Sequence, residues 1–313
     1  MRRAVTRSVP ALRFAALHVP DYRRYFVATL LAMTGDTIEH VISYWVIFQK
    51  FHSPTLAGFA VVSHWVPFLL FSAFTGALAD RYDCRKLIHV SQALYLMATL
   101  AWGLLILTDT LQIWHAVVIL LVHGFAGVAG GTASQLIIHD MVGAGHLHSA
   151  VRLNASSRHL ALLLGPAVGA GFMLALGAAG GLLANVLMYL PLTILLLRIP
   201  YTGHSGRAEP RTPGRHGGLA AWLQVLREAS ADRRIMTMIM LGGATSFFVG
   251  NAFQAQMPEY AHDLGADEAG IGYSVLLTAN AVGAVLGAVL LESVDVLRPS
   301  ARAAIMYAAA WAV

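Results

Sequence analysis

Eight apolar runs dominate the sequence, and each is close to the 20 or so residues that a helix needs to cross a bilayer core. They cover residues 24–49, 55–79, 87–108, 113–138, 150–176, 179–199, 234–258 and 269–291. A ninth run begins near Arg302 and extends for about 11 residues to Val313, which is too short to cross. The runs predict an all-α membrane protein with about eight full transmembrane helices and part of a ninth.

The charged residues are few, and they lie at the ends of these runs. Only 12% of the 313 residues are charged, against about 25% in soluble proteins, and 57% are hydrophobic. The isoelectric point of about 9.6 would suit nucleic-acid binding, but the basic residues are not spread over a soluble surface. We therefore expect membrane lipids and no nucleic acid as partners. The single cysteine, Cys84, excludes an internal disulfide.

Lysine and arginine fall at alternate ends of the runs, which predicts the orientation in the membrane. Six arginines lie before or at the start of the first run and seven lie from Arg198 to Arg234, whereas the alternate loops hold only Lys50. The N-terminus and the central loop should therefore be cytoplasmic. We expect an integral protein of the bacterial cytoplasmic (inner) membrane with an uncleaved first helix, because the first run is long and lacks an A-x-A cleavage site.

Residues 200–233 differ in kind from the runs on either side. Their first half is rich in glycine, proline, serine and arginine and their second half has apolar residues at helical spacing, which predicts a cytoplasmic linker with a surface helix. Short patterns repeat across this linker at an offset of about 211 residues, as at Arg23–Arg24 and Arg233–Arg234. We expect an N-terminal six-helix bundle over 1–199 and an incomplete C-terminal bundle over 234–313.

A dense charge cluster stands between the second and third runs. It reads G-A-L-A-D-R-Y-D-C-R-K from Gly76 to Lys86, and its charges require a water-facing loop between two membrane helices. The glycine would let two helices approach closely, and Asp80 lies where it can accept hydrogen bonds from a helix start. This spacing resembles the signature loop between helices 2 and 3 of the major facilitator superfamily.

The resemblance implies the major facilitator fold and a gating role for this loop. The gating residues are Gly76, Asp80, Arg81, Arg85 and Lys86. By resemblance, Asp80 bonds across the inner seam between the two bundles, while the three cations stabilise the loop and the outward-open state.

Further segments resemble one group within that superfamily. Asp21–Phe26 and Ala150–Asn154 are similar to the group that includes the enterobactin exporter and macrolide efflux proteins, the transmembrane secretion effectors. The fifth run carries Gly165, Pro166 and Gly169, which resemble the G-P-x-x-G-G motif of exporters. The alternative is a kinked packing helix without directional meaning, because small residues are common where membrane helices pack.

Two acidic residues in the first run are the strongest candidates for a functional site. Asp36 and Glu39 would lie about 18 and 22 Å into the membrane, at 1.5 Å per residue from Arg24. An ionised carboxylate there costs at least about 2.5 kcal/mol, so it should face a cavity, find a partner or bind a proton. With His40 beside them, these acids predict a proton-loading site. The alternative is a polar pair locked to a neighbouring helix, as by His64 or His123.

Other polar residues are candidates for the same proton and substrate site. His123 stands among glycines in the fourth run and could move protons, although a lone histidine there more often has a packing role. Asn251 and Gln254, near the outer end of the seventh run, could line a cleft for a partly polar substrate.

The sequence lacks the common motifs of nucleotide-driven transport and enzymatic catalysis. It predicts no cofactor, and no metal, because His139, Asp140, His146 and His148 lack compact ligand spacing. We predict a secondary transporter, not an enzyme: a proton-coupled exporter of amphipathic, drug-like or siderophore-like small molecules. The alternatives are a truncated, non-transporting remnant or membrane interaction protein, and a nutrient importer. If the chain is instead a fragment of an exporter, the C-terminal helices that the two-bundle fold still lacks would come from the full-length chain.

Overall fold

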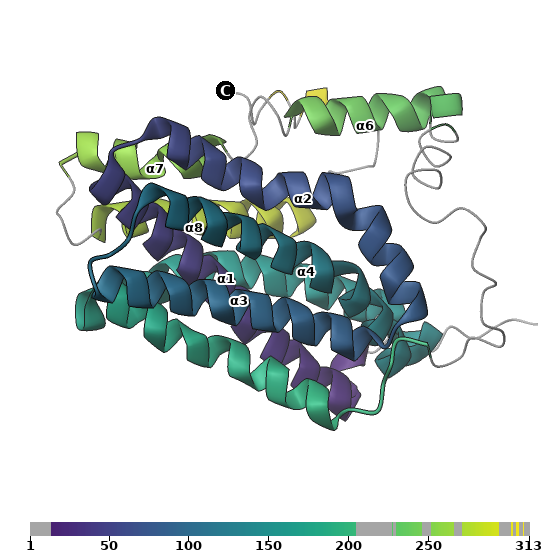
Figure 1. The fold of residues 1–313 in the computed structure, drawn as a ribbon. Coiled ribbons are helices and arrows are strands. Elements are labelled where there is room, and N and C mark those ends of the chain that lie inside the picture. Colours follow the sequence, from purple (N-terminus) through teal and green to yellow (C-terminus); the bar gives the residue numbers. More distant parts are fainter. Residues whose placement is uncertain are drawn as a thin grey trace, which may run out of the picture.

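The computed structural model describes residues 14–204, 227, 230–245, 252–265, 271–293, 302, 305, 306 and 309. The elements in these residues are helices (Figure 1). They are η1 (Ala15–His18), α1 (Pro20–Phe51), α2 (Pro54–Arg81), α3 (Cys84–Leu107), α4 (Ile113–Arg198), α6 (Arg233–Thr245), α7 (Ala252–Asp263) and α8 (Ile271–Ser293). The expected all-α architecture is confirmed for this part of the chain.

The long helix α4 is broken at two glycines, so it contributes three segments to the fold. Gly143 and Gly177 have φ values of +63° and +71°, in the left-handed region where glycine has no steric penalty. Each segment reaches the length that a bilayer core requires. With α1, α2 and α3 they form a bundle of six helical segments (Figure 1). A loop was expected between the fourth and fifth runs, over residues 139–149. This expectation was wrong, because these residues are helical except at Gly143.

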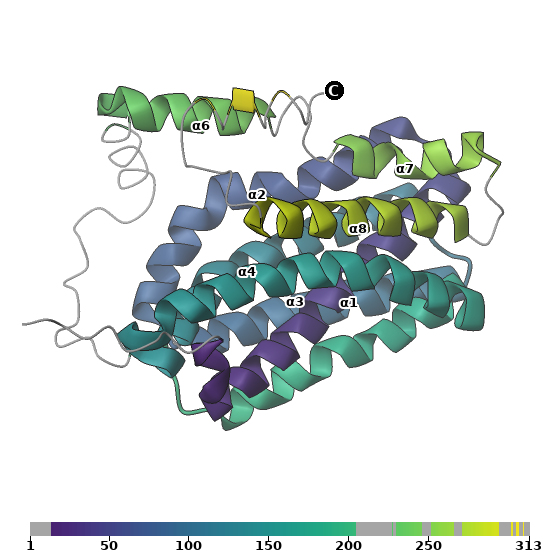
Figure 2. The ribbon, with the colours of Figure 1, turned by 180° about the vertical axis from the view of Figure 1, so that it is seen from behind.

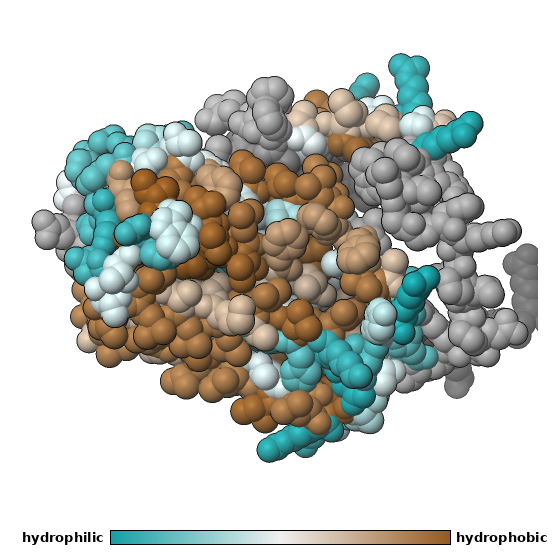
Figure 3. All heavy atoms as spheres, in the orientation of Figure 1, coloured by the Kyte–Doolittle hydropathy of each residue, from teal (hydrophilic) through white to brown (hydrophobic). Residues whose placement is uncertain are grey.

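The flanks of the bundle are apolar and its two ends are polar (Figure 3). By length and composition, three of the described helices could cross a membrane: α2 over Pro54–Ser72, α3 and α4. The outer face carries exposed side chains such as Leu69, Leu104 and Leu187. A surface of this kind suits contact with lipid chains and indicates an integral membrane protein.

Two apolar clusters pack the bundle, and a polar layer separates them along α1. One cluster includes Tyr22, Tyr25 and Ala32 of α1, and the other begins at Ile38. Along α1, Asp36 lies between these two sets of residues. Buried Glu39 directly follows Ile38, the first α1 residue of the second cluster. The packing of both ends therefore holds the polar layer at the centre of the bundle.

The helix expected over 234–258 is described only in its two end parts. The structure has two helices in this range, α6 and α7, and residues 246–251 lie outside the described part. Helix α8 lies across the face of α4, with α7 beside it (Figure 2). The rings of Trp45 on α1 and Tyr273 on α8 stack with centroids 5.6 Å apart. Helix α6 lies apart from the bundle, beyond α2 (Figures 1 and 2).

Candidate functional site

A close approach of α2 to α4 determines which polar groups meet. A Cβ atom at Gly124 of α4 would lie 2.1 Å from the backbone oxygen of Ser63 on α2, so only glycine fits at this distance. This contact places the residue after Ser63, His64, beside the residue before Gly124, His123. Their ring centroids are 5.7 Å apart.

A second close approach holds α4 against α1. A Cβ at Gly165 would lie 2.4 Å from Thr37 Cγ2, and one at Gly169 would lie 3.5 Å from Val41 Cγ1. Gly165, Gly169 and the intervening Pro166 are buried. The motif of the fifth run thus makes helix–helix contacts, as small residues do in membrane bundles. Its expected association with export stays a prediction.

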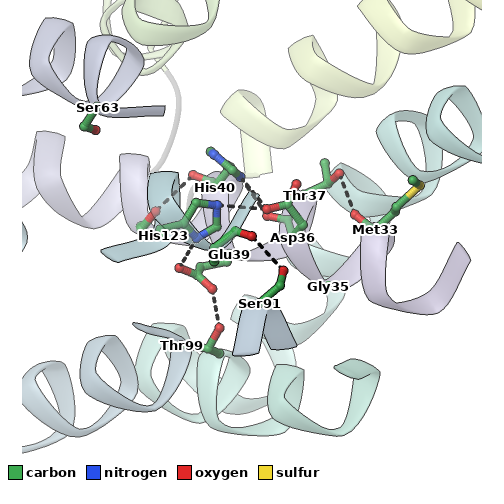
Figure 4. A network of polar contacts seen from close by, with 12 residues as sticks. Met33, Gly35, Asp36, Thr37, Glu39, His40, Ser63, Ser91, Thr99 and His123 are labelled. Atoms are coloured by element: carbon green, nitrogen blue, oxygen red, sulfur yellow. Dashed lines mark hydrogen bonds and ion pairs between the residues drawn. The ribbon is translucent and has the colours of Figure 1, made fainter. Parts of the chain in front are cut away.

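His123 lies between the two carboxylates of α1 (Figure 4). Its Nδ1 is 2.9 Å from Glu39 Oε1, within hydrogen-bond geometry, and its Nε2 is 2.9 Å from Asp36 Oδ1. The second contact has the distance of an ion pair but lacks the direction of a hydrogen bond. The side chains of His123 and Glu39 are 5% and 2% exposed, so these groups are shielded from solvent.

Helix α3 supplies further groups around Glu39. The Thr99 hydroxyl donates a hydrogen bond to Glu39 Oε2 (Figure 4). The ring of Tyr95, one turn earlier on α3, meets the ring of His123 edge-on with centroids 4.9 Å apart. Both oxygens of the Glu39 carboxylate therefore have partners, one from α4 and one from α3.

His40 and His64 complete the cluster around a small cavity. His40 Nδ1 lies 2.8 Å from the backbone oxygen of Asp36, and its ring centroid is 5.0 Å from that of His64. The cavity has about 10 Å³ of room for the centres of water molecules, which is space for about one. The Asp36 side chain is 30% exposed and that of His40 is 23% exposed. Access to the buried groups therefore runs past these two residues.

In this arrangement a titratable ring lies between two carboxylates. An imidazolium has an N–H on each nitrogen, so a protonated His123 could donate toward both carboxylates. Two ionised carboxylates and one imidazolium sum to one negative charge, which is costly in a bilayer without a further cation. Arg158 of α4 lies close enough to act electrostatically on His64. Removing one partner of such a buried set would leave an uncompensated charge.

The structure brings together four of the expected site residues. Asp36, Glu39, His40 and His123 share one cluster, and His123 has polar partners besides its packing contacts. Asn251 and the side chain of Gln254 lie outside the described residues. Thr99 was not among the residues expected at the site. The only signal in the sequence is that it lies one helical turn after Tyr95, on the same face of α3.

The connection between α2 and α3 is organised around Asp83, which was not among the expected gating residues. Asp83 caps α3 by accepting from the Arg85 backbone N–H at 2.9 Å. The Arg85 guanidinium bonds the same carboxylate at 2.6 Å, which holds the pKa of Asp83 below its ordinary value of 3.8. Arg85 Nη1 also donates to the Ile199 carbonyl oxygen at 2.7 Å, so it ties the loop to the end of α4.

The loop expected from Gly76 to Lys86 is reduced to Tyr82 and Asp83, because α2 extends to Arg81 and α3 begins at Cys84. The other residues of the segment lie at the ends of these helices. Asp80, Arg81 and Lys86 are exposed, and the Asp80 carbonyl oxygen lies 3.2 Å from His204 Nε2. A Cβ at Gly76 would meet Thr132 at 3.9 Å, an ordinary contact. The expected reason for this glycine, a close helix approach, is therefore wrong for the described helices.

Known proteins resemble the chain over most of its length. The staphyloferrin A transporter of Staphylococcus aureus is 20% identical over 273 residues, which cover 86% of this chain and 66% of that protein. The solved bacterial homolog of the human lysosomal transporter Spinster, inward-facing and unoccupied, has a TM-score of 0.59 at 18% identity. The match covers 87% of this chain and 62% of that one, so this chain spans about two thirds of the length of these relatives.

A second solved structure and a family model agree with these matches. The D-xylose-proton symporter has a TM-score of 0.54 at 19% identity, and covers 90% of this chain and 69% of its own. Both solved structures share the fold of this protein, and these relatives are transporters rather than enzymes. The model described as transmembrane secretion effector matches residues 11–312. The chain therefore belongs to the transmembrane secretion effector family of the major facilitator superfamily.

Proposed function

We propose that this protein is a secondary transporter that exports an amphipathic small molecule in exchange for protons. The contact of His123 with Asp36 and Glu39 carries the proposal, because it joins α4 to α1 through charges inside a membrane bundle. Family membership and the name of the staphyloferrin A transporter support transport of a drug-like or siderophore-like molecule.

The proposed coupling follows from the charge of this cluster. Proton binding to a carboxylate removes its charge and weakens its contact with His123, so the loaded and unloaded clusters favour different arrangements of α1 and α4. Asp36 and His40 are partly exposed, and a substrate with polar groups would compete with protons there. Competition of this kind is what exchange in opposite directions requires.

We also propose the location of the protein, its orientation in the membrane and the extent of its two bundles. We place it in the bacterial cytoplasmic membrane with a cytoplasmic N-terminus, which puts the loop from Gly76 to Lys86 on the inner side. Asp80 would bond across the inner seam there, and Arg81, Arg85 and Lys86 would stabilise the loop. We retain bundles over 1–199 and 234–313, joined by a linker over 200–233.

Transport assays in everted vesicles test the function. Vesicles from cells that express the natural reading frame would be energised with an acid interior and supplied with fluorescent amphipathic dyes. We expect pH-driven uptake into everted vesicles, which corresponds to export from the cell. Uptake only into right-side-out vesicles would instead favour a nutrient importer, and no transport in either direction would favour a non-transporting membrane protein.

Amide variants test the coupling residues. We expect Asp36→Asn or Glu39→Gln to abolish pH-driven transport, because each removes a charge that binds protons. Asp109→Asn is the matched control, since Asp109 is exposed and pairs with Lys50 outside the cluster. Gradient-driven transport that survives both cluster changes would contradict the proposed role.

A further inference from the structure

Three histidines from three different helices converge on one point. His40 of α1, His64 of α2 and His123 of α4 each offer a ring nitrogen, and these three nitrogens all lie within 4.8 Å of one another. Imidazole is the side chain that divalent transition metals most often bind. No sequence spacing would reveal this set, because the residues are brought together by helix packing.

Among the described residues, three buried polar atoms of this cluster have no hydrogen-bond partner, although two of them, on Asp36 and His123, lie 2.9 Å apart as an ion pair. They are Asp36 Oδ1, His64 Nδ1 and His123 Nε2. Buried polar atoms are normally satisfied, so orphans gathered in one place indicate an absent ion or water. A single cation between the rings would satisfy all three atoms.

In two of the histidines, ring nitrogen Nδ1 already has the kind of partner that metal-bound histidines have. Metal-bound histidines usually direct their second ring nitrogen to a carboxylate or a backbone carbonyl. His123 Nδ1 faces Glu39 Oε1 at 2.9 Å, and His40 Nδ1 faces the Asp36 carbonyl oxygen at 2.8 Å. Thr99 in turn holds Glu39. Nε2 is therefore the nitrogen of each ring that would bind the metal, and in His123 it lies 2.9 Å from Asp36 Oδ1.

We propose that His40, His64 and His123 form a binding site for one divalent transition-metal ion of the zinc class. The Asp36 carboxylate, 2.9 Å from His123 Nε2, is the candidate for the fourth ligand. Three imidazoles with one oxygen ligand suit Zn²⁺ and its close analogue Co²⁺. In a tetrahedral site with bonds near 2.0–2.1 Å, ligand atoms lie about 3.3 Å apart. The nitrogens, now within 4.8 Å, therefore need to close by about 1.5 Å at most, which side-chain rotation supplies.

The size and exposure of the site fit a bare ion. The cavity has room for about one water, so a hydrated ion must lose its water shell to enter. Asp36 and His40 are partly exposed and provide the entry path. Metal binding does not require transport, so its failure and failure of the exchange function are separate results.

Titration with Co²⁺ tests the site on the purified full chain in detergent. Tetrahedral Co²⁺ has a strong visible absorption, and we expect it to appear with one equivalent of Co²⁺ and to disappear on addition of Zn²⁺. His64→Gln should weaken Co²⁺ binding at least tenfold. Glu39→Gln should weaken it about 10- to 100-fold, as loss of outer-shell partners does. The control His159→Gln changes an exposed histidine of α4 outside the cluster and should leave affinity unchanged.

X-ray absorption of the Zn²⁺-loaded wild-type protein provides a test without mutations. We expect a coordination shell with three imidazoles at about 2.0–2.1 Å. Fewer than two imidazoles in that shell would overturn the proposal. So would equal Co²⁺ affinity in His64→Gln and wild type, provided circular dichroism shows both to be equally helical.

Discussion

Replacing Gly124 by alanine should separate α2 from α4 and disrupt the polar cluster. The new Cβ would lie 2.1 Å from the Ser63 backbone oxygen and 3.1 Å from Pro67 Cγ. Ordinary contact begins at 3.4 Å, and the difference of 1.3 Å must come from movement of backbone, since Ser63 oxygen is not part of a flexible side chain. Overpacking of this kind costs about 1–3 kcal/mol.

The matched control is Gly171→Ala in the next segment of α4. A Cβ at Gly171 would meet nothing within 4 Å, so this change adds the helix propensity of alanine without a clash. Alanine is favoured over glycine in a helix interior by about 1 kcal/mol, and both variants share this gain. The difference between the two variants therefore isolates the steric cost at Gly124.

The assay is reversible unfolding of the purified protein in mixed detergent micelles, followed by circular dichroism. We expect Gly124→Ala to be less stable than Gly171→Ala by about 1–3 kcal/mol. Co²⁺ affinity should fall with it, because His64 follows Ser63 and would move away from His123. Equal stability of the two variants, with unchanged Co²⁺ binding, would refute the close approach as the cause of the cluster.

Two further substitutions test the surroundings of the cluster and the loop. Thr99→Val keeps the side-chain shape but removes the hydroxyl that bonds Glu39; we expect a loss of about 1–3 kcal/mol in unfolding free energy, measured in the same micelles, because a buried carboxylate oxygen loses its donor. Asp83→Asn keeps a good cap for α3 but removes the charge paired with Arg85, and should cost up to about 1 kcal/mol. Because the folded pKa of Asp83 is lowered, its stabilisation is present above the ordinary value of 3.8 and is lost as pH falls through the folded pKa. Unfolding free energies of wild type and Asp83→Asn should therefore converge in acid, and a constant difference would contradict the ion pair.

The sequence alone was sufficient for the fold class and for most helix positions. A helix that crosses lipid must be apolar for about 20 residues, and this requirement is local, so it can be read directly. The same reasoning identified Asp36 and Glu39, because an acid in such a run is costly and has to be explained. The charged loop was also identified, although Asp83 rather than Asp80 proved to cap α3.

Only the tertiary structure decided which groups meet inside the bundle. His64, His123 and Thr99 lie on three helices: the close approach of α2 to α4 at Gly124 places His64 beside His123, and Thr99 reaches Glu39 from α3. Periodicity shows which residues share a face of one helix, but it contains no information about the rotation of one helix against another. That rotation is fixed by side chains packing across the interface, and it turned isolated polar residues into one site.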